Sequence, residues 1–477
     1  MVEGPRLYNS LTRREERFVP AHDDDVRFFV CGQTVYDDAH LGHAKSYVNF
    51  DVVVRWLRCR GYKVRYIQNI TDVDDKIIAR AKERGEEPVA LARRYEERFL
   101  EDMERIGVRK NVDMYPRSHD YIKQIAEQIG LLVKKGYAYS IGQDIYFDVA
   151  KFKDYTKLSG MKLEELEKHR IEAKEGKRHA YDFALWKEAK EEEPSWKIAV
   201  EENGVEKKFV GRPGWHIEDT AMSVSIFGEQ YDLHGGAREL IFPHHTNEIA
   251  QAEAAYGKRP FVKYWIHSGI LSVNGEKMSK SLGNFITIRE ILKDYSSETL
   301  RLFVCSTQYA KDIDYNERAM SEAKKRLAYI NSSLSIFYNA KELEEDKESD
   351  IGHITEGLWK EFRAAMDGDF NTPLALSSII RAVEKLRAYA EMKGGVGKLE
   401  KEHALSRVLE CASVLGLLED GVYRKSIPKE ASALIKERER LRSVKDFGKA
   451  DAIRTELKAK YNIGIEDSEY GTVWYYV

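Results

Sequence analysis

Two lysines in a short polar segment give the clearest indication of chemistry in this chain. Lys277 and Lys280 belong to the pentapeptide Lys-Met-Ser-Lys-Ser, which follows the turn-forming pair Asn274-Gly275. Flexible ammonium groups at this spacing can neutralise the charge that develops on a polyphosphate as its bonds break. Residues 277–281, hereafter the lysine loop, therefore predict phosphate chemistry, with an ordinary solvated loop as the alternative.

A second phosphate-type motif is His-Leu-Gly-His at residues 40–43, hereafter the histidine turn. Apolar patterns predict a βαβ unit whose helix begins at this turn, with strand, helix and strand at residues 26–31, 44–61 and 63–67. The free N–H groups of a helix N-terminus attract phosphate, and Gly42 permits a close approach. His40 and His43 can donate hydrogen bonds to phosphate oxygens, although two surface histidines that cap a helix would give the same pattern.

The two motifs and the sequence around them resemble the HIGH and KMSKS signatures of cysteinyl-tRNA synthetases, a family of class I aminoacyl-tRNA synthetases. The matching stretches follow the order of that family, at residues 30–43, 69–76, 214–218, 242–245, 247–251 and 277–284. The resemblance implies an enzyme that activates cysteine with ATP to cysteinyl-adenylate. It then implies transfer of the cysteinyl group to the 3′ end of tRNA(Cys).

The same resemblance implies an α/β fold with a Rossmann-like parallel-sheet catalytic domain split by an insertion. A helical bundle and a small C-terminal α+β module are expected to follow. We place the two halves of the catalytic domain at residues 1–120 and 211–272, around a connective insertion at 121–210. The remaining parts are a lysine-loop domain, the bundle and an anticodon-recognition module, at 273–320, 321–424 and 425–477.

Local patterns add detail within these parts. Residues 121–135 predict a helix, and residues 137–148 predict a hairpin that turns at Gly142-Gln143. The C-terminal module contains charged helices and ends in a turn-rich stretch. Its aromatic residues could stack on unpaired bases of an anticodon loop, namely Trp474, Tyr475 and Tyr476.

The resemblance also assigns roles to single residues. The catalytic set is His40, His43, Lys277 and Lys280. The same four residues bind ATP together with Thr34 and Gly42, and Mg²⁺ is expected to accompany ATP. Cys31, Thr71 and Trp215 are expected to face the amino-acid substrate, although Thr71 and Trp215 could instead be structural. The chemistry is an in-line attack of the cysteine carboxylate on the α-phosphate, which needs positioning and charge stabilisation.

A further set of side chains indicates a metal site. Cys31 ends the first strand, and His244 and Glu248 are spaced to share one face of a helix. A thiolate, an imidazole and a carboxylate form a zinc set that lacks one ligand. In the family that ligand is a cysteine directly after Gly-Trp-His-Ile-Glu, whereas this chain has Asp219. We expect one Zn²⁺ held by Cys31, Asp219, His244 and Glu248, more weakly than by two thiolates.

Composition limits the cellular setting. Of the 477 residues, 33% are charged and 43% are hydrophobic, and the net charge is −3. An RNA partner must therefore bind to local basic patches. The four cysteines form no CxxC pair, which favours a reducing compartment over a disulfide framework. No leader-like or membrane-length apolar segment is found, so we expect a cytoplasmic protein whose partners are ATP, L-cysteine and tRNA(Cys).

Three other functions use parts of the same pattern. A ligase that joins cysteine to a small amine would keep the catalytic core but would not need an anticodon module. A simple nucleotidyltransferase would need neither the metal set nor the additional C-terminal residues. An inactive RNA-binding paralogue would not be expected to keep both histidines and both lysines.

Overall fold

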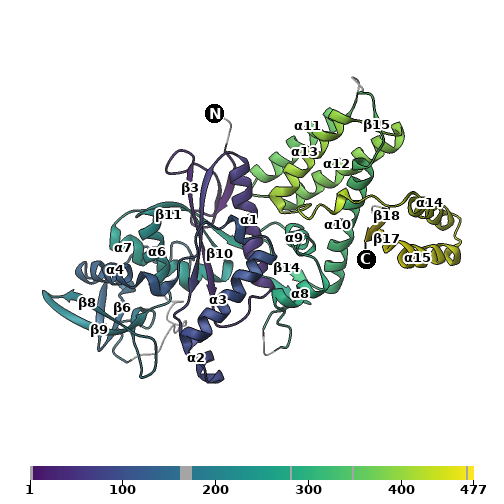
Figure 1. The fold of residues 1–477 in the computed structure, drawn as a ribbon. Coiled ribbons are helices and arrows are strands. Elements are labelled where there is room, and N and C mark those ends of the chain that lie inside the picture. Colours follow the sequence, from purple (N-terminus) through teal and green to yellow (C-terminus); the bar gives the residue numbers. More distant parts are fainter. Residues whose placement is uncertain (1–3, 162–174, 280–281, 346–348, 469–470, 477) are drawn as a thin grey trace. The chain divides into compact units, whose positions relative to one another are not determined.

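The computed structural model describes residues 4–161, 175–279, 282–345, 349–468 and 471–476 (Figure 1). The chain forms two compact units. The first contains Met1–Leu271, Met278–Ile291 and Tyr309–Asp312, and the second contains Ser272–Lys277, Leu292–Gln308 and Ile313–Val477. The chain therefore passes between the units at the lysine loop, where Lys277 belongs to the second unit and Met278 to the first.

A parallel sheet lies at the centre of the first unit. Its strand order is β11-β10-β3-β4, with bounds Val262–Ser268, Tyr231–Ala237, Asp25–Thr34 and Lys63–Thr71. The strands are rich in β-branched and aromatic residues and are almost fully buried, as expected for a parallel sheet covered by helices. The βαβ unit predicted from the sequence is present, because β3 and β4 pair in parallel on either side of α1 (Leu41–Cys59).

The sheet order indicates where a ligand would bind. From β3 the chain passes through α1 to β4, whereas from β10 it passes through α7 (Thr246–Tyr256) to β11 at the opposite edge. The order therefore reverses between β3 and β10, and ligands of open α/β sheets bind outside the carboxyl ends of the strands at such a point. The two central strands come from distant parts of the sequence, since Leu233 pairs with Phe28.

An irregularity shapes the carboxyl end of β3. The pairing register with β4 shifts between Val30 and Gln33. Gly32 lies inside this shift, and a Cβ atom there would come within 1.6 Å of the Asn69 carbonyl oxygen. Only glycine therefore allows β3 and β4 to approach this closely beside Cys31.

Four further described helices belong to the first unit, and α4 lies within the insertion. They are α2, α3, α4 and α6, with bounds Asp75–Arg84, Pro88–Arg105, Ile122–Lys134 and Ile217–Phe227. Helix α4 matches the helix predicted at residues 121–135. A short π-turn, η5 (Ile241–His245), leads directly into α7.

The insertion forms an antiparallel sheet of order β5-β6-β7-β9-β8. Its strands are Ala138–Ile141, Asp144–Phe147, Phe183–Glu188, Val205–Pro213 and Trp196–Glu202, in the same order. The hairpin predicted at residues 137–148 is formed by β5 and β6. Ile129 of α4, Phe147 and Trp186 are buried in one hydrophobic cluster that also includes Ile217 of α6 and Ala250 of α7, so this segment packs on the helices of the parallel sheet.

The second unit is mainly helical. Its larger helices are α9 (Ser297–Cys305), α10 (Glu317–Tyr338), α11 (Ile351–Asp367), α12 (Thr372–Lys393), α13 (Lys398–Leu415), α14 (Lys429–Ser443) and α15 (Phe447–Tyr461). The short helix α8 (Ile288–Asp294) follows the lysine loop. Short strands are β12 (Leu271–Val273), β13 (Glu276–Lys277) and β14 (Ile313–Tyr315), and β15 (Glu342–Leu343) with β16 (Val396–Gly397).

The N-terminal hairpin of the first unit is β1 (Arg6–Asn9) and β2 (Arg14–Arg17).

The C-terminal stretch differs from its sequence-based description. Instead of a turn-rich segment, it is a β-hairpin of β17 (Ile463–Ser468) and β18 (Gly471–Tyr476). Trp474 is buried against α14 and α15, in a cluster with Ile435 and Leu457. The expectation that Trp474 stacks on RNA bases is therefore wrong, because its indole contributes to the core of the module.

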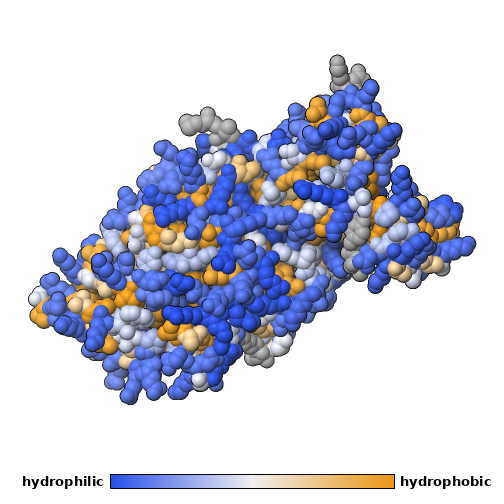
Figure 2. Space-filling view, viewed as in Figure 1, coloured by the Kyte–Doolittle hydropathy of each residue, from blue (hydrophilic) through white to orange (hydrophobic). Residues whose placement is uncertain are grey.

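The surface fits the composition. Hydrophilic residues dominate the face drawn in Figure 2, and hydrophobic ones are scattered among them. None of the four cysteines, all of which lie in described residues, forms a disulfide. Within the described residues, no helix combines the length and the apolar character that a membrane crossing requires.

Candidate active site and metal centre

The histidine turn has a defined hydrogen-bond geometry. His40 is the N-cap of α1, where its Nδ1 accepts a hydrogen bond from the Gly42 N–H at 3.1 Å. His43 Nδ1 accepts from the His40 N–H at 3.3 Å, and the two rings stack with centroids 3.8 Å apart. A neutral imidazole whose Nδ1 accepts carries its proton on Nε2. Both rings therefore present Nε2–H donors.

Burial keeps these imidazoles neutral. It lowers the pKa of His40 to about 4. Burial also lowers the pKa of His43, and the neighbouring His40 and Lys76 lower it further. A Cβ atom on residue 42 would lie 2.9 Å from His40 Cε1, so Gly42 is needed for the ring to fold over the turn. The turn can thus donate hydrogen bonds to phosphate, but the positive charge must come from elsewhere.

The segment after the lysine loop is attached to the histidine turn. Leu41 N–H donates to the Ile286 carbonyl at 3.1 Å, and Ile288 N–H donates to the Ala39 carbonyl at 2.9 Å. Met278 Cε lies 3.8 Å from the position that a Cβ of Gly42 would take. Two motifs far apart in the sequence are therefore adjacent in the first unit.

The structure describes one of the two lysines of the loop. Lys277 is exposed in β13, where it pairs with Ser272. Lys280, the other lysine proposed to be catalytic, lies outside the described residues. Between them, Ser279 N–H donates to Asn284 Oδ1 at 2.8 Å, which fixes part of the loop's path.

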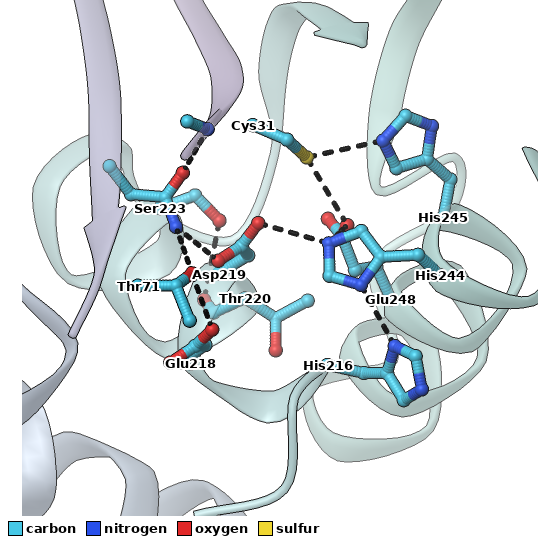
Figure 3. A network of polar contacts seen from close by, with 12 residues as sticks. Cys31, Thr71, His216, Glu218, Asp219, Thr220, Ser223, His244, His245 and Glu248 are labelled. Atoms are coloured by element: carbon cyan, nitrogen blue, oxygen red, sulfur yellow. Dashed lines mark hydrogen bonds and ion pairs between the residues drawn. The ribbon is translucent and has the colours of Figure 1, made fainter. Parts of the chain in front are cut away.

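Four buried side chains gather beside the carboxyl end of β3 (Figure 3). Their ligand-type atoms all lie within 4.8 Å of one another, and they belong to Cys31, His244, His245 and Glu248. Cys31 Sγ is 3.2 Å from His245 Nε2 and 3.8 Å from Glu248 Oε1. His244 Nε2 is 3.0 Å from the same Glu248 oxygen. One thiol, two imidazoles and one carboxylate thus converge on a single point.

Asp219 borders this cluster. Its Oδ2 lies 3.1 Å from His244 Nε2, and its Oδ1 accepts from Asn69 Nδ2 at 2.7 Å. Asn69 also accepts from the Gly32 N–H at 2.6 Å, so the carboxylate is held to the end of β3. Of the predicted metal ligands, the structure brings Cys31, His244 and Glu248 together and places Asp219 beside them.

His245 is the member of the cluster that sequence reasoning missed. On a regular helix, consecutive side chains point about 100° apart, so only His244 was expected to face Glu248. The backbone is not regular here, because Phe242 has non-helical dihedral angles inside η5. The available signal was the His-His pair directly after Phe242-Pro243.

The electrostatics of the cluster favour a cation. Burial raises the pKa of the Cys31 thiol, and the Glu248 and Asp219 carboxylates raise it further. Burial alone would lower the pKa of His244, but the same two carboxylates outweigh it and raise the value to about 10. Glu248 Oε2 makes no hydrogen bond to described residues. The protonated imidazole of His244 balances the carboxylates here, a charge that a bound metal would supply instead, and the donor set fits Zn²⁺.

The predicted substrate-facing residues lie around the same crevice. Thr34 and Thr71 end β3 and β4 and are paired in register. Thr71 Oγ1 donates to Glu218 Oε1 at 2.8 Å. The half-buried Trp215 stacks on His244 with ring centroids 4.6 Å apart. The indole therefore forms an apolar wall against the proposed metal cluster.

Comparison with known proteins agrees with this architecture. Residues 17–325 match the family model described as the tRNA synthetases class I (C) catalytic domain, and residues 361–419 match the DALR domain. A methionyl-tRNA synthetase of Mycobacterium tuberculosis, solved with methionyl-adenylate, has a similar fold with a TM-score of 0.58 at 16% identity. That likeness covers 82% of this chain and 89% of the other. The fold is that of a class I aminoacyl-tRNA synthetase, and the predicted fold class is confirmed.

Sequence relatives narrow the family. A cysteine–tRNA ligase of Thermococcus onnurineus is 44% identical over 98% of both chains. One from Pyrococcus abyssi is 45% identical over 99% of this chain and 98% of its own, and one from Heliobacterium modesticaldum is 42% identical over 98% and 99%. The chain belongs to the cysteine–tRNA ligase family.

Proposed function

We propose that this chain activates L-cysteine with ATP and transfers the cysteinyl group to the 3′ end of tRNA(Cys) in the cytoplasm. One observation carries the proposal. Cys31, at the metal cluster, lies in β3 near its carboxyl end, and His40, at the histidine turn, caps α1 after the short connection that follows β3. A group that suits a thiol and a group that suits phosphate therefore border the same crevice.

We assign amino-acid selection to the metal cluster. Cys31, His244 and Glu248 would hold Zn²⁺, with Asp219 as the fourth ligand predicted from the sequence and His245 as a further candidate. Zinc, when bound, supplies a soft Lewis acid that prefers the sulfur of cysteine to the neutral hydroxyl of serine. Trp215 encloses this side of the crevice, and Thr71 offers a hydroxyl to the polar end of the amino acid.

We assign adenylate formation to the histidine turn and the lysine loop. The Nε2–H groups of His40 and His43 would donate to phosphate oxygens of ATP, with Thr34 and the backbone at Gly42 nearby. The carboxylate of cysteine attacks the α-phosphate, and Lys277 and Lys280 neutralise the departing pyrophosphate. Mg²⁺ is expected to enter with ATP.

We assign tRNA recognition to the second unit, with the anticodon read by residues 425–477. The helices α14 and α15 of this module carry many basic side chains on a small core, which suits contact with RNA phosphate. A ligase for a small amine would gain nothing from such a module, so the proposal favours tRNA as the acceptor.

The test is cysteine-dependent exchange of pyrophosphate into ATP, followed by charging of tRNA(Cys). Exchange should require cysteine and should not proceed with serine. Charging should require the complete chain, whereas removal of residues 425–477 should weaken charging and leave exchange largely intact. Exchange without any charging of tRNA(Cys) would instead favour the small-amine ligase.

A further inference from the structure

Arg289, at the start of α8, connects the lysine loop to a helix that neither proposed active-site motif contains. Its Nη2 donates to Glu101 Oε2 at 2.6 Å and to the Arg98 carbonyl at 2.9 Å. Its Nε lies 3.1 Å from Asp102 Oδ1. All three contacts are on α3, so one guanidinium fixes the segment after the loop to that helix.

The burial of Asp102 makes its ion pair with Arg289 important. Its side chain is fully buried, and neither carboxylate oxygen makes a hydrogen bond to described residues. Burial raises its pKa to about 6, while Arg289 is the leading group that lowers it. A buried carboxylate that loses its main cationic partner is poorly compensated. The ion pair therefore favours the arrangement in which Arg289 stays bound to α3.

The same helix also fixes the entrance to the histidine turn. Arg98 Nε and Nη2 bind the two oxygens of Asp38 at 2.5 Å and 2.9 Å. Asp38 precedes the histidine turn by two residues, and its Oδ1 lies 4.0 Å from Arg289 Nε. Helix α3 is thus bound to segments next to both proposed phosphate-binding motifs. Arg98 binds the segment before the histidine turn, and Arg289 belongs to the segment after the lysine loop.

We propose that Arg289 is a positioning residue for adenylate formation, which holds the segment after the lysine loop against the histidine turn through its ion pairs with Asp102 and Glu101. This inference rests on the proposed function. The guanidinium of Arg289 is held on α3, so Arg289 acts through the segment that it fixes. Its loss should therefore affect the turnover of the activation step more than the binding of cysteine, because small displacements of charged groups at a reacting centre are costly.

The test compares Arg289→Ala, Arg289→Lys and the control Arg94→Ala. Arg94 lies on the same helix, but its ion pair is with Glu86 at 2.6 Å and with neither Asp38 nor Asp102. In ATP–pyrophosphate exchange, Arg289→Ala should lower kcat by roughly tenfold to a hundredfold and change the KM for cysteine by less than about twofold. Arg289→Lys should recover part of kcat, because an ammonium can still compensate Asp102.

Loss of folding is separated from loss of positioning by the double variant Arg289→Gln with Asp102→Asn. It removes both charges of the pair, so it should fold with a melting temperature near that of the wild type and still exchange slowly. Two results would overturn this inference and leave the proposed function intact. One is exchange by Arg289→Ala at the rate of Arg94→Ala, and the other is a rise in the KM for cysteine at unchanged kcat. An unmodified chain without cysteine-dependent exchange would overturn the proposed function itself.

Discussion

His245 Nε2 lies 3.2 Å from Cys31 Sγ, although the two residues are 214 positions apart in the chain. The other ring nitrogen, Nδ1, is 2.8 Å from His267 Nε2, and His267 Nδ1 is 2.7 Å from Ser10 Oγ. When Nδ1 of His245 donates along this relay, Nε2 keeps its lone pair directed at the cluster. Outer hydrogen bonds of this kind orient metal-bound imidazoles.

This geometry predicts that His245 contributes to metal binding. His245→Asn should weaken zinc affinity by roughly tenfold or more, measured by competition with a chromogenic chelator. X-ray absorption should count one imidazole fewer at the metal. The exposed His353 of α11 provides the control, since His353→Asn should leave both readings unchanged. Equal zinc affinity in the two variants would exclude His245 from the ligand set.

Asp219 gives a second prediction for the same centre. Its carboxylate lies 3.1 Å from His244 Nε2, within reach of a metal bound there. Asp219→Cys should slow the removal of zinc by a chelator, because a thiolate is a softer ligand than a carboxylate. Asp219→Ala should speed removal and raise the KM for cysteine. Fully active protein that contains no transition metal would contradict both expectations and leave cysteine selection to Thr71 and Trp215.

The lysine loop predicts a kinetic effect. Lys280→Ala should lower the rate of ATP–pyrophosphate exchange by roughly a hundredfold, because a charge placed at the reacting centre is lost. Cysteine binding should change little. Lys258→Ala, at an exposed position after α7, is the matched control and should exchange normally. A Lys280→Ala variant as fast as this control would show that the loop is not catalytic.

Glu298 predicts a pH dependence of stability in the second unit. It is buried in α9, and its Oε1 accepts from the backbone N–H of Glu419 at 2.7 Å and of Asp420 at 3.1 Å. Burial raises its pKa from 4.5 to about 7, with Asp420 adding to the shift. The folded state therefore holds a proton that the unfolded state releases near 4.5. Its stabilising contribution is complete below that value and is lost as pH rises through about 7.

Glu298→Gln should remove this slope. Between about pH 5 and about pH 8, the wild type should lose up to about 3 kcal/mol of unfolding free energy that the variant does not lose. Urea titrations at several pH values measure the difference. Glu437→Gln, at an exposed ion pair with Arg440, should follow the wild type. Parallel curves for wild type and Glu298→Gln would contradict the assignment.

The sequence by itself determined the local elements and the motifs they carry. Hydrophobic periodicity located the βαβ unit around α1, the helix α4 and the hairpin of β5 and β6, because each depends on neighbours within a few residues. His40 and Gly42 mark a helix start, and the local sequence alone indicates that this start suits phosphate. The spacing of His244 and Glu248 likewise required only a turn between them.

Tertiary structure decided what depends on distant partners. Only the pairing of β10 with β3 brings His245 to Cys31, and only the packing of α14 and α15 turns Trp474 from a candidate RNA contact into a core residue. The ion pair between Arg289 and Asp102 likewise joins residues far apart in the sequence. Which strands pair and which surfaces meet is fixed by burial summed over the whole unit, so single-residue patterns do not contain it.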